Sequence, residues 1–258
     1  MLPSFANFLA RRGISQRVET YSAKKMAWVT PSRWLSNLAM TSKPLRGETV
    51  HTIPNGIDLA VFHPAAKAKA KLDLGLPLDR PIVLFGAASS TTDPRKGFDL
   101  LLAALTEMYR LYPNQMLSLA VFGNGPETSQ VSTFPYKINY LGQFSEDSKL
   151  ASIYAAADVF VAPSRQENLA NTVVESLGVG TPVVAFDIGG MPDMIEHLKN
   201  GFLARPFDST DMARGISWVI DKARNPELQK AARKTAETLF SAERQADSFR
   251  KLYHSLLV

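Results

Sequence analysis

The amino-acid sequence predicts an α/β protein whose main domain is a doubly wound parallel sheet. From residue 81 onward, short runs rich in β-branched and aromatic residues alternate with longer segments of helical periodicity. Strands separated by helices form βαβ units, and such units pair in parallel with helices on both faces of the sheet. The length of 258 residues allows one large domain, or one full domain and part of another.

Six apolar runs are predicted strands, and the segments between them are mostly predicted helices. The predicted strands cover residues 81–86, 116–123, 137–142, 158–163, 181–186 and 201–206. The predicted helices cover 98–112, 145–157, about 172–179 and about 191–198, and the pattern after residue 208 is helical to the end. Right-handed crossovers make this a Rossmann-like sheet, whose ligands bind beyond the carboxyl ends of the strands.

The first 50 residues are not predicted to form a complete domain. Residues 26–39 are typical of one strand and one helix, and residues 50–59 of a strand that enters a turn. The lysine-rich stretch 65–81 is typical of a connector. Because a strand and a helix cannot bury a core alone, we interpret the chain as the second half of a larger two-domain protein.

The composition excludes several classes of protein. Hydrophobic residues make up 45% and charged residues 21%, as in ordinary globular domains, and no apolar run approaches the roughly 18 residues of a membrane-spanning helix. The absence of cysteine excludes disulfides, thiolate zinc sites and a cysteine nucleophile, and it fits a cytoplasmic protein. The four histidines are scattered, so we expect neither a metal site nor a resident cofactor.

Positive charge is concentrated at the start of the chain. The first 50 residues contain eight basic and two acidic residues, for a net charge of +6, whereas the rest has a net charge of −1. We expect no nucleic-acid partner, because no basic motif interleaved with aromatic residues is present. A peripheral contact with an anionic membrane stays open as an interpretation. Residues 1–12 are too short and too weakly charged for a signal peptide.

The loop at residues 86–97 ends in Arg95, Lys96 and Gly97 at a predicted helix start. Amides at a helix start together with a lysine form an anion site, and the alternative is an ordinary polar loop with solvated basic residues. The loop matches neither the Walker pattern nor G-x-G-x-x-G, which disfavours P-loop enzymes and dehydrogenases.

Two glutamates eight residues apart follow the strand predicted at 158–163. Glu175 lies one turn into a helix that starts near Asn171, where it can accept hydrogen bonds from a vicinal diol at roughly 1.5–3 kcal/mol each. Glu167 is nearer the strand end, and the amides of Ala170, Asn171 and Thr172 point into the same cleft. In the alternative interpretation, Glu175 only complements the helix dipole and Glu167 is a solvated loop residue.

Taken in order, these residues resemble the donor-binding core of retaining glycosyltransferases of family 4, which have the two-domain GT-B fold. The family pattern combines a Pro-Ser pair, an E-x7-E spacing, a G-x-P-V-V-A strand, a G-G turn and an N-G strand. The matching residues are Pro163-Ser164, Glu167 and Glu175, Gly180 to Ala185, Gly189-Gly190, and Asn200-Gly201. Further matches are the hinge Ile53 to Asp58, the lysine loop Lys96-Gly97, the turn Gly123 to Pro126, and a Y-x3-D from Tyr154 to Asp158.

The resemblance implies that a nucleoside diphosphate sugar binds in the carboxy-terminal domain. Glu175 would hold the ribose hydroxyls, and the catalytic residues would be Glu167 at the donor sugar and Lys96 at the diphosphate. The other donor-binding residues would be Leu169, Ala170, Asn171 and Thr172 at the diphosphate, Gln143 and Phe144 at the base, and Arg95 in place of a family arginine where this chain has Ala87. The family uses no metal ion, so fixed positive groups would stabilise the departing nucleoside diphosphate.

The resemblance also implies how the chain is divided. Residues 1–58 would be a remnant of the amino-terminal acceptor domain with the hinge, 59–80 a linker, 81–240 the donor-binding domain and 241–258 a carboxy-terminal helix. The full enzyme would transfer a sugar with retention to a glycan or lipid-linked acceptor, in polysaccharide biosynthesis at the inner face of the membrane. Transfer would require the missing acceptor domain or a partner chain.

Two other functions stay open at the level of sequence. One is a truncated module that binds a nucleotide without transferring sugar. The other is a GT-B-like sugar-nucleotide epimerase, which would need both domains and a different set of acids and bases. A dehydrogenase is disfavoured because no G-x-G-x-x-G opens a helix.

Overall fold

The computed structural model describes residues 26–86, 93–123, 134–222 and 226–257. The chain forms two compact units, residues 1–54 and residues 55–258. Three features of the sequence lie outside the described residues: the apolar stretch 1–12, the position of Ala87, and most of the turn from Gly123 to Pro126.

The first unit contains a single βαβ element in its described part. Strands β1 (Trp28–Thr30) and β2 (Val50–Thr52) pair in parallel, and α2 (Arg33–Thr41) with the short η1 (Lys43–Leu45) connects them. Ser32 caps α2, because its hydroxyl oxygen accepts a hydrogen bond from the Leu35 amide at 3.2 Å. The strands and the helix predicted for this part of the sequence are confirmed.

The second unit is built on a six-stranded parallel sheet, and all six predicted strands are confirmed. They are β3 (Ile82–Gly86), β4 (Ser118–Phe122), β5 (Lys137–Gly142), β6 (Val159–Ala162), β7 (Val183–Phe186) and β8 (Gly201–Ala204), in the order β5-β4-β3-β6-β7-β8. The strand order reverses between β3 and β6. In doubly wound sheets, ligands bind at this switch point, beyond the carboxyl ends of the strands.

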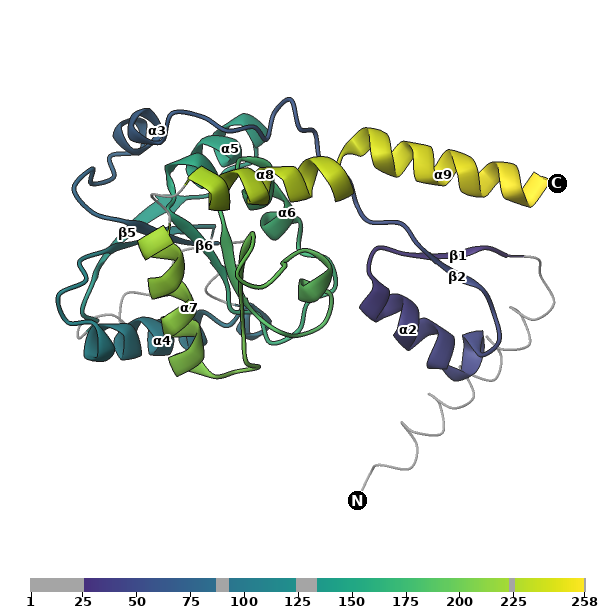
Figure 1. The fold of residues 1–258 in the computed structure, drawn as a ribbon, viewed down its shortest axis with the longest axis horizontal. Coiled ribbons are helices and arrows are strands. Elements are labelled where there is room, and N and C mark those ends of the chain that lie inside the picture. Colours follow the sequence, from purple (N-terminus) through teal and green to yellow (C-terminus); the bar gives the residue numbers. More distant parts are fainter. Residues whose placement is uncertain (1–25, 87–92, 124–133, 223–225, 258) are drawn as a thin grey trace, which may run out of the picture. The chain divides into compact units, whose positions relative to one another are not determined.

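Helices cover both faces of the sheet (Figure 1). On one face lie α4 (Phe98–Leu111) and α7 (Ser209–Lys222), and on the other lie α5 (Asp147–Ala156), α6 (Asn171–Gly178) and α8 (Pro226–Leu239). Along β3, Val83 and Phe85 face the first layer, whereas Ile82 and Leu84 face the second. Because both faces are covered, the inner strands β3, β6 and β7 are apolar throughout, whereas the edge strand β5 includes the polar residues Lys137 and Asn139.

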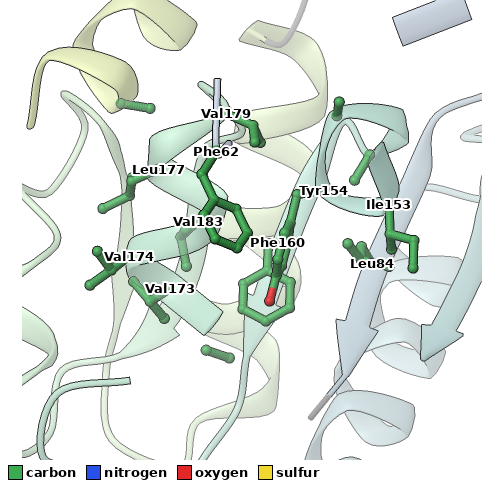
Figure 2. Close-up of a cluster of buried hydrophobic side chains, with 14 of the residues drawn as sticks. Phe62, Leu84, Ile153, Tyr154, Phe160, Val173, Val174, Leu177, Val179 and Val183 are labelled. Carbon is green, nitrogen blue, oxygen red and sulfur yellow. The ribbon is translucent and has the colours of Figure 1, made fainter. Parts of the chain in front are cut away.

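One cluster of buried hydrophobic side chains fills the layer between the sheet and helices α5 and α6 (Figure 2). The ring of Tyr154 from α5 lies edge-on to Phe160 from β6, with their centroids 5.5 Å apart. Phe62, from the segment before α3, packs into the same cluster. The side chain of Tyr154 therefore has a fixed position between the sheet and α6.

The stretch 65–81, predicted as a connector, contains the helix α3 (Lys67–Asp73). Lys67 and Lys71 both donate to the carboxylate of Asp158, at 2.8 and 2.9 Å, and the Ile82 amide donates to it at 2.8 Å. Burial raises the pKa of Asp158, but the two ammonium groups outweigh that effect and keep the pKa below its usual value. These ion pairs, with the buried Ala70, attach α3 to the second unit.

The prediction of a helix at about 191–198 is wrong. Only a single 3-10 turn forms there, η4 (Met191–Asp193). The side chain of the buried Asn200 explains the difference, because it accepts from the Glu196 amide at 2.8 Å and donates to the Met194 carbonyl at 3.0 Å. These bonds hold the segment in a loop. The chain ends in α9 (Ala242–Leu257), and the three helices predicted after residue 208 are confirmed.

Candidate functional site

Two oppositely charged side chains meet at the switch point. Lys96 ends the 3-10 turn η2 (Pro94–Lys96) in the loop after β3, and Glu167 lies in the loop after β6. The Lys96 ammonium lies 2.8 Å from Oε2 of Glu167, and the hydroxyl of the buried Ser164 lies 3.4 Å from the same oxygen. Both charged side chains are partly exposed, 30% for Lys96 and 16% for Glu167, so a ligand can reach them.

The two loops are connected by close backbone contacts. Gly97 has φ of +71°, and a Cβ at this position would collide with the carbonyl oxygen of Pro163. Arg165 donates from its amide to the Arg95 carbonyl and from its guanidinium to the Pro94 carbonyl, each at 2.8 Å. These contacts fix the position of Lys96 relative to Glu167.

The backbone of Glu167 is supported by the turn at Gly189 and Gly190. Gly189 has φ of +53°, and a Cβ there would collide with the Glu167 carbonyl oxygen. The Gly190 amide donates to the same oxygen at 3.2 Å. The two glycines therefore allow this turn to approach the backbone of Glu167 closely.

The second glutamate lies deeper in the molecule. Glu175 is on the second turn of α6, and its Oε2 accepts a hydrogen bond from the Tyr154 hydroxyl at 2.8 Å. Burial raises the pKa of Glu175, the Tyr154 hydrogen bond lowers it, and the charge of Asp147 raises it further. The net effect is a pKa above the ordinary value.

A pocket of about 300 Å³ lies in front of Glu175. Its lining residues come from the ends of β4 and β5 and from α5 and α6: Phe122, Gly123, Gln143, Phe144, Leu150, Tyr154, Thr172 and Glu175. A narrower crevice is lined in part by Lys96, Ser164, Glu167, Ala170 and Thr172. Because Thr172 lines both, the two hollows are neighbours at the carboxyl edge of the sheet, and we refer to them together as the groove.

The amino end of α6 lies where the two hollows meet. Ala170 is the N-cap residue and provides no side-chain cap, so the amides of Asn171 and Thr172 keep their hydrogen-bonding capacity for a ligand. A helix start of this kind favours an anion such as phosphate. The side chain of Leu169 is buried in the core, so only its backbone is available to a ligand.

Seven of the ten predicted site residues line this groove: Lys96, Gln143, Phe144, Glu167, Ala170, Thr172 and Glu175. Leu169 and Asn171 are neighbours of these residues in the chain but line neither hollow. Arg95 also lies outside the lining, with its guanidinium 2.7 Å from Asp93 and its side chain 74% exposed. Sequence reasoning missed the contact between Tyr154 and Glu175 and the bridging role of Arg165. The Y-x3-D motif marks Tyr154 but gives no sign of its partner, and no sequence signal singles out Arg165.

Among the residues that the structure describes, no three His, Asp or Glu side chains converge in a way that could hold a metal ion. Every described helix is also too short or too polar to cross a bilayer.

The fold and the groove together define a doubly wound α/β domain with a Lys96–Glu167 pair, a helix start and the buried Glu175 at its switch point. The sequence profile of the family described as glycosyl transferases group 1 matches residues 80–222, more than half of the chain. The chain belongs to this family. The resemblance to family 4 glycosyltransferases with the GT-B fold is thereby confirmed.

Individual relatives agree with this assignment. The chain is 29% identical over 226 residues to a D-inositol 3-phosphate glycosyltransferase of Saccharomonospora viridis, a match that covers 81% of this chain and 51% of the relative. The chain spans about half the length of the curated relatives it matches most strongly.

Two solved structures show the same fold. A carboxy-terminal domain of a glycosyl transferase group 1 protein (LpcC) from Francisella tularensis aligns with a TM-score of 0.60 and 21% identity, over 72% of this chain and 100% of that domain. Anabaena HepE in complex with UDP-glucose aligns with a TM-score of 0.73 and 21% identity, over 94% of this chain and 67% of HepE. The predicted Rossmann-like fold of a GT-B carboxy-terminal domain is confirmed, and the chain also contains a small two-stranded parallel sheet.

Proposed function

We propose that this chain carries the donor site of a glycosyltransferase that transfers a sugar from a nucleoside diphosphate sugar to a glycan or lipid-linked acceptor. The observation that supports it is the groove in which Glu175, the start of α6, and the Lys96–Glu167 pair follow one another. A nucleoside diphosphate sugar presents a base, a diol, a diphosphate and a sugar in the same order.

Each part of the donor has a matching group in the groove. The pocket beside Gln143 and Phe144 takes the base, and Glu175 accepts hydrogen bonds from the ribose hydroxyls. The diphosphate lies on the start of α6 and on Lys96, which places the sugar at Glu167. The complex of HepE with UDP-glucose supports this class of donor, because HepE has the same fold.

The same groups serve the transfer step. Negative charge develops on the nucleoside diphosphate as its bond to the sugar breaks, and the Lys96 ammonium and the α6 amides are already in place to stabilise it. Glu167 lies beside Lys96 and is placed to orient the donor sugar. We infer retention of configuration from the family alone.

We propose that the acceptor binds to a part of the relatives' length that this sequence does not span. We propose that residues 1–58 represent the end of an acceptor domain and its hinge, 59–80 a linker, 81–240 the donor domain and 241–258 a terminal helix. The one-half coverage of relatives also supports a second candidate function, in which this chain binds the nucleotide sugar and transfers nothing by itself.

The positive charge of the first 50 residues bears on where the protein acts. The net charge of +6 in the first 50 residues supports contact of the full cytoplasmic enzyme with an anionic membrane face. Liposomes with and without anionic lipid, at low and high salt, test this proposal. Equal recovery on both liposome types would overturn it.

A thermal-shift panel of UDP, GDP, ADP and their sugars tests the donor site. A ligand at 100 times its dissociation constant adds about 2.7 kcal/mol to the unfolding free energy, which predicts a rise of roughly 5–10 °C in Tm. We expect one base to give this rise, Glu175→Ala to abolish it, and the surface variant Glu196→Ala to retain it. No rise with any nucleotide would contradict the proposal.

A further inference from the structure

A buried hydroxyl supports one of the two proposed ligand-binding carboxylates. The side chain of Tyr154 has no exposed surface, and its ring is edge-on to Phe122 and Phe160 with centroid distances of 5.6 and 5.5 Å. Figure 2 shows Tyr154 beside Phe160. Its hydroxyl donates to Oε2 of Glu175 at 2.8 Å. A buried tyrosine hydroxyl requires such a partner, but the choice of a carboxylate that also faces a pocket is unusual for a residue of the core.

The position of this hydroxyl is fixed from several directions. The two aromatic contacts restrict the ring, and the Thr181 hydroxyl donates to the Tyr154 carbonyl at 2.8 Å, which restricts the backbone at the end of α5. Burial and the nearby Glu175 charge raise the pKa of Tyr154 far above its usual value, so the hydroxyl remains a donor. A fixed donor fixes the acceptor that it binds.

The hydrogen bond divides the two oxygens of Glu175 between two tasks. Oε2 is bound to Tyr154, and in the described part of the chain no other group donates to this carboxylate. Oε1 and the second lone pair of Oε2 thus remain for a ligand in the adjacent pocket. A carboxylate held by one oxygen has a single orientation, whereas an unheld glutamate side chain would have to lose rotamer freedom on binding.

We propose that Tyr154 is a positioning residue, which orients the Glu175 carboxylate so that it can accept hydrogen bonds from a vicinal diol in the pocket. This inference rests on the proposed function, in which the diol is the ribose of a nucleotide. It adds a specificity determinant, because discrimination between ribose and a sugar without the diol depends on the Tyr154 hydroxyl. Tyr154 itself does not need to touch the ligand.

The test compares Tyr154→Phe with the parent chain by titration calorimetry. The probes are the nucleoside diphosphate that gives the largest thermal shift and its 2′,3′-dideoxy analogue. We expect Tyr154→Phe to weaken binding of the diol nucleotide by about tenfold and to leave the dideoxy analogue within a factor of two. In a Glu175→Ala background, the added Tyr154→Phe change should have no further effect on either ligand.

The outcomes separate this inference from the proposed function. Equal weakening of both ligands by Tyr154→Phe would show a merely structural role and overturn the inference while the donor site stands. Unchanged affinity for both would overturn it as well. A parent chain that binds neither ligand would overturn the proposed function, and the inference with it. The Tm of the unliganded Tyr154→Phe variant separates misfolding from a true change in affinity.

A pH series provides a second readout. The Tyr154 hydrogen bond lowers the pKa of Glu175, so its removal should move the acid limit of diol binding to higher pH. In the described residues, the other titratable group that acts on Glu175 is Asp147, which remains in the variant. An acid limit that is the same in parent and variant would contradict the inference.

Discussion

The two ends of the groove hold similar carboxylates by different means. Glu175 is largely buried, and an uncharged hydroxyl from the core supports it. Glu167 is on a loop, paired with the Lys96 ammonium and supported by backbone contacts to glycine turns. A diol needs a carboxylate of fixed direction, whereas the reacting end needs a positive charge held where negative charge develops as a bond breaks. The difference between the ends therefore matches the different chemistry proposed for each.

Removal of the Lys96 ammonium should have the largest effect on ligand binding. The effect should be confined to the diphosphate end of the groove. We expect Lys96→Met to weaken binding of a nucleoside diphosphate by about 100-fold, because a charge-assisted contact to phosphate is lost. Binding of the corresponding nucleoside, which lacks phosphate, should stay within about twofold. Calorimetric titration of both ligands checks this prediction.

The exposed Lys199 provides the matched control, since its ammonium pairs only with Glu196 among the described side chains. Lys199→Met removes the same charge from the chain but should leave both affinities unchanged. A similar loss in both variants would mean that overall charge, and not the groove, attracts the diphosphate.

Substitution of Gly97 should have the second-largest effect on affinity for the nucleoside diphosphate. Alanine at Gly97 suffers from the left-handed backbone and also collides with the Pro163 carbonyl, so Lys96 must shift. We expect affinity for the nucleoside diphosphate to fall by roughly 10- to 30-fold because the Lys96 ammonium is displaced from the diphosphate.

A variant at Gly75 distinguishes the effect of the left-handed backbone from that of the collision with Pro163. It has a similar φ of +64°, but a Cβ there would meet nothing within 4 Å. Gly75→Ala and Gly97→Ala should share a cost of about 1 kcal/mol from the left-handed backbone, and only Gly97→Ala should lose affinity. Equal affinities of the two variants for the diphosphate would show that the loop contact does not position Lys96.

Lowering the pH should weaken diol binding at the buried end. A glutamate with a raised pKa is ionised above that pKa and loses its charge as the pH falls through it, at a higher pH than an ordinary glutamate. Binding of a diol nucleotide should thus weaken relative to its dideoxy analogue by about twofold when the pH equals the raised pKa, and by about tenfold well below it. The dideoxy analogue corrects for protonation of the phosphates, and parallel pH curves for the two ligands would contradict the prediction.

The same contrast explains how much could be predicted from the sequence. Most strands are predictable because they are short, largely apolar runs, and the E-x7-E spacing with the helix start places both glutamates. The helix α3 is not predictable, because the partner of its lysines, Asp158, lies 87 residues from Lys71 in the chain. The loop at 194–200 depends in the same way on the folded position of the Asn200 side chain.

The smallest effect is expected at Arg95, which the sequence places among the donor-binding residues. Its guanidinium is directed to Asp93 and is mostly exposed to solvent, where a charge contributes little. We therefore expect Arg95→Ala to weaken nucleoside diphosphate binding by only about two- to threefold at low salt, with the difference vanishing at high salt. A loss as large as that of Lys96→Met would mean that Arg95 leaves Asp93 and binds the diphosphate directly. The Glu167 end would then differ more from the Glu175 end, because the Arg95 charge would join Lys96 at the diphosphate only when the donor binds.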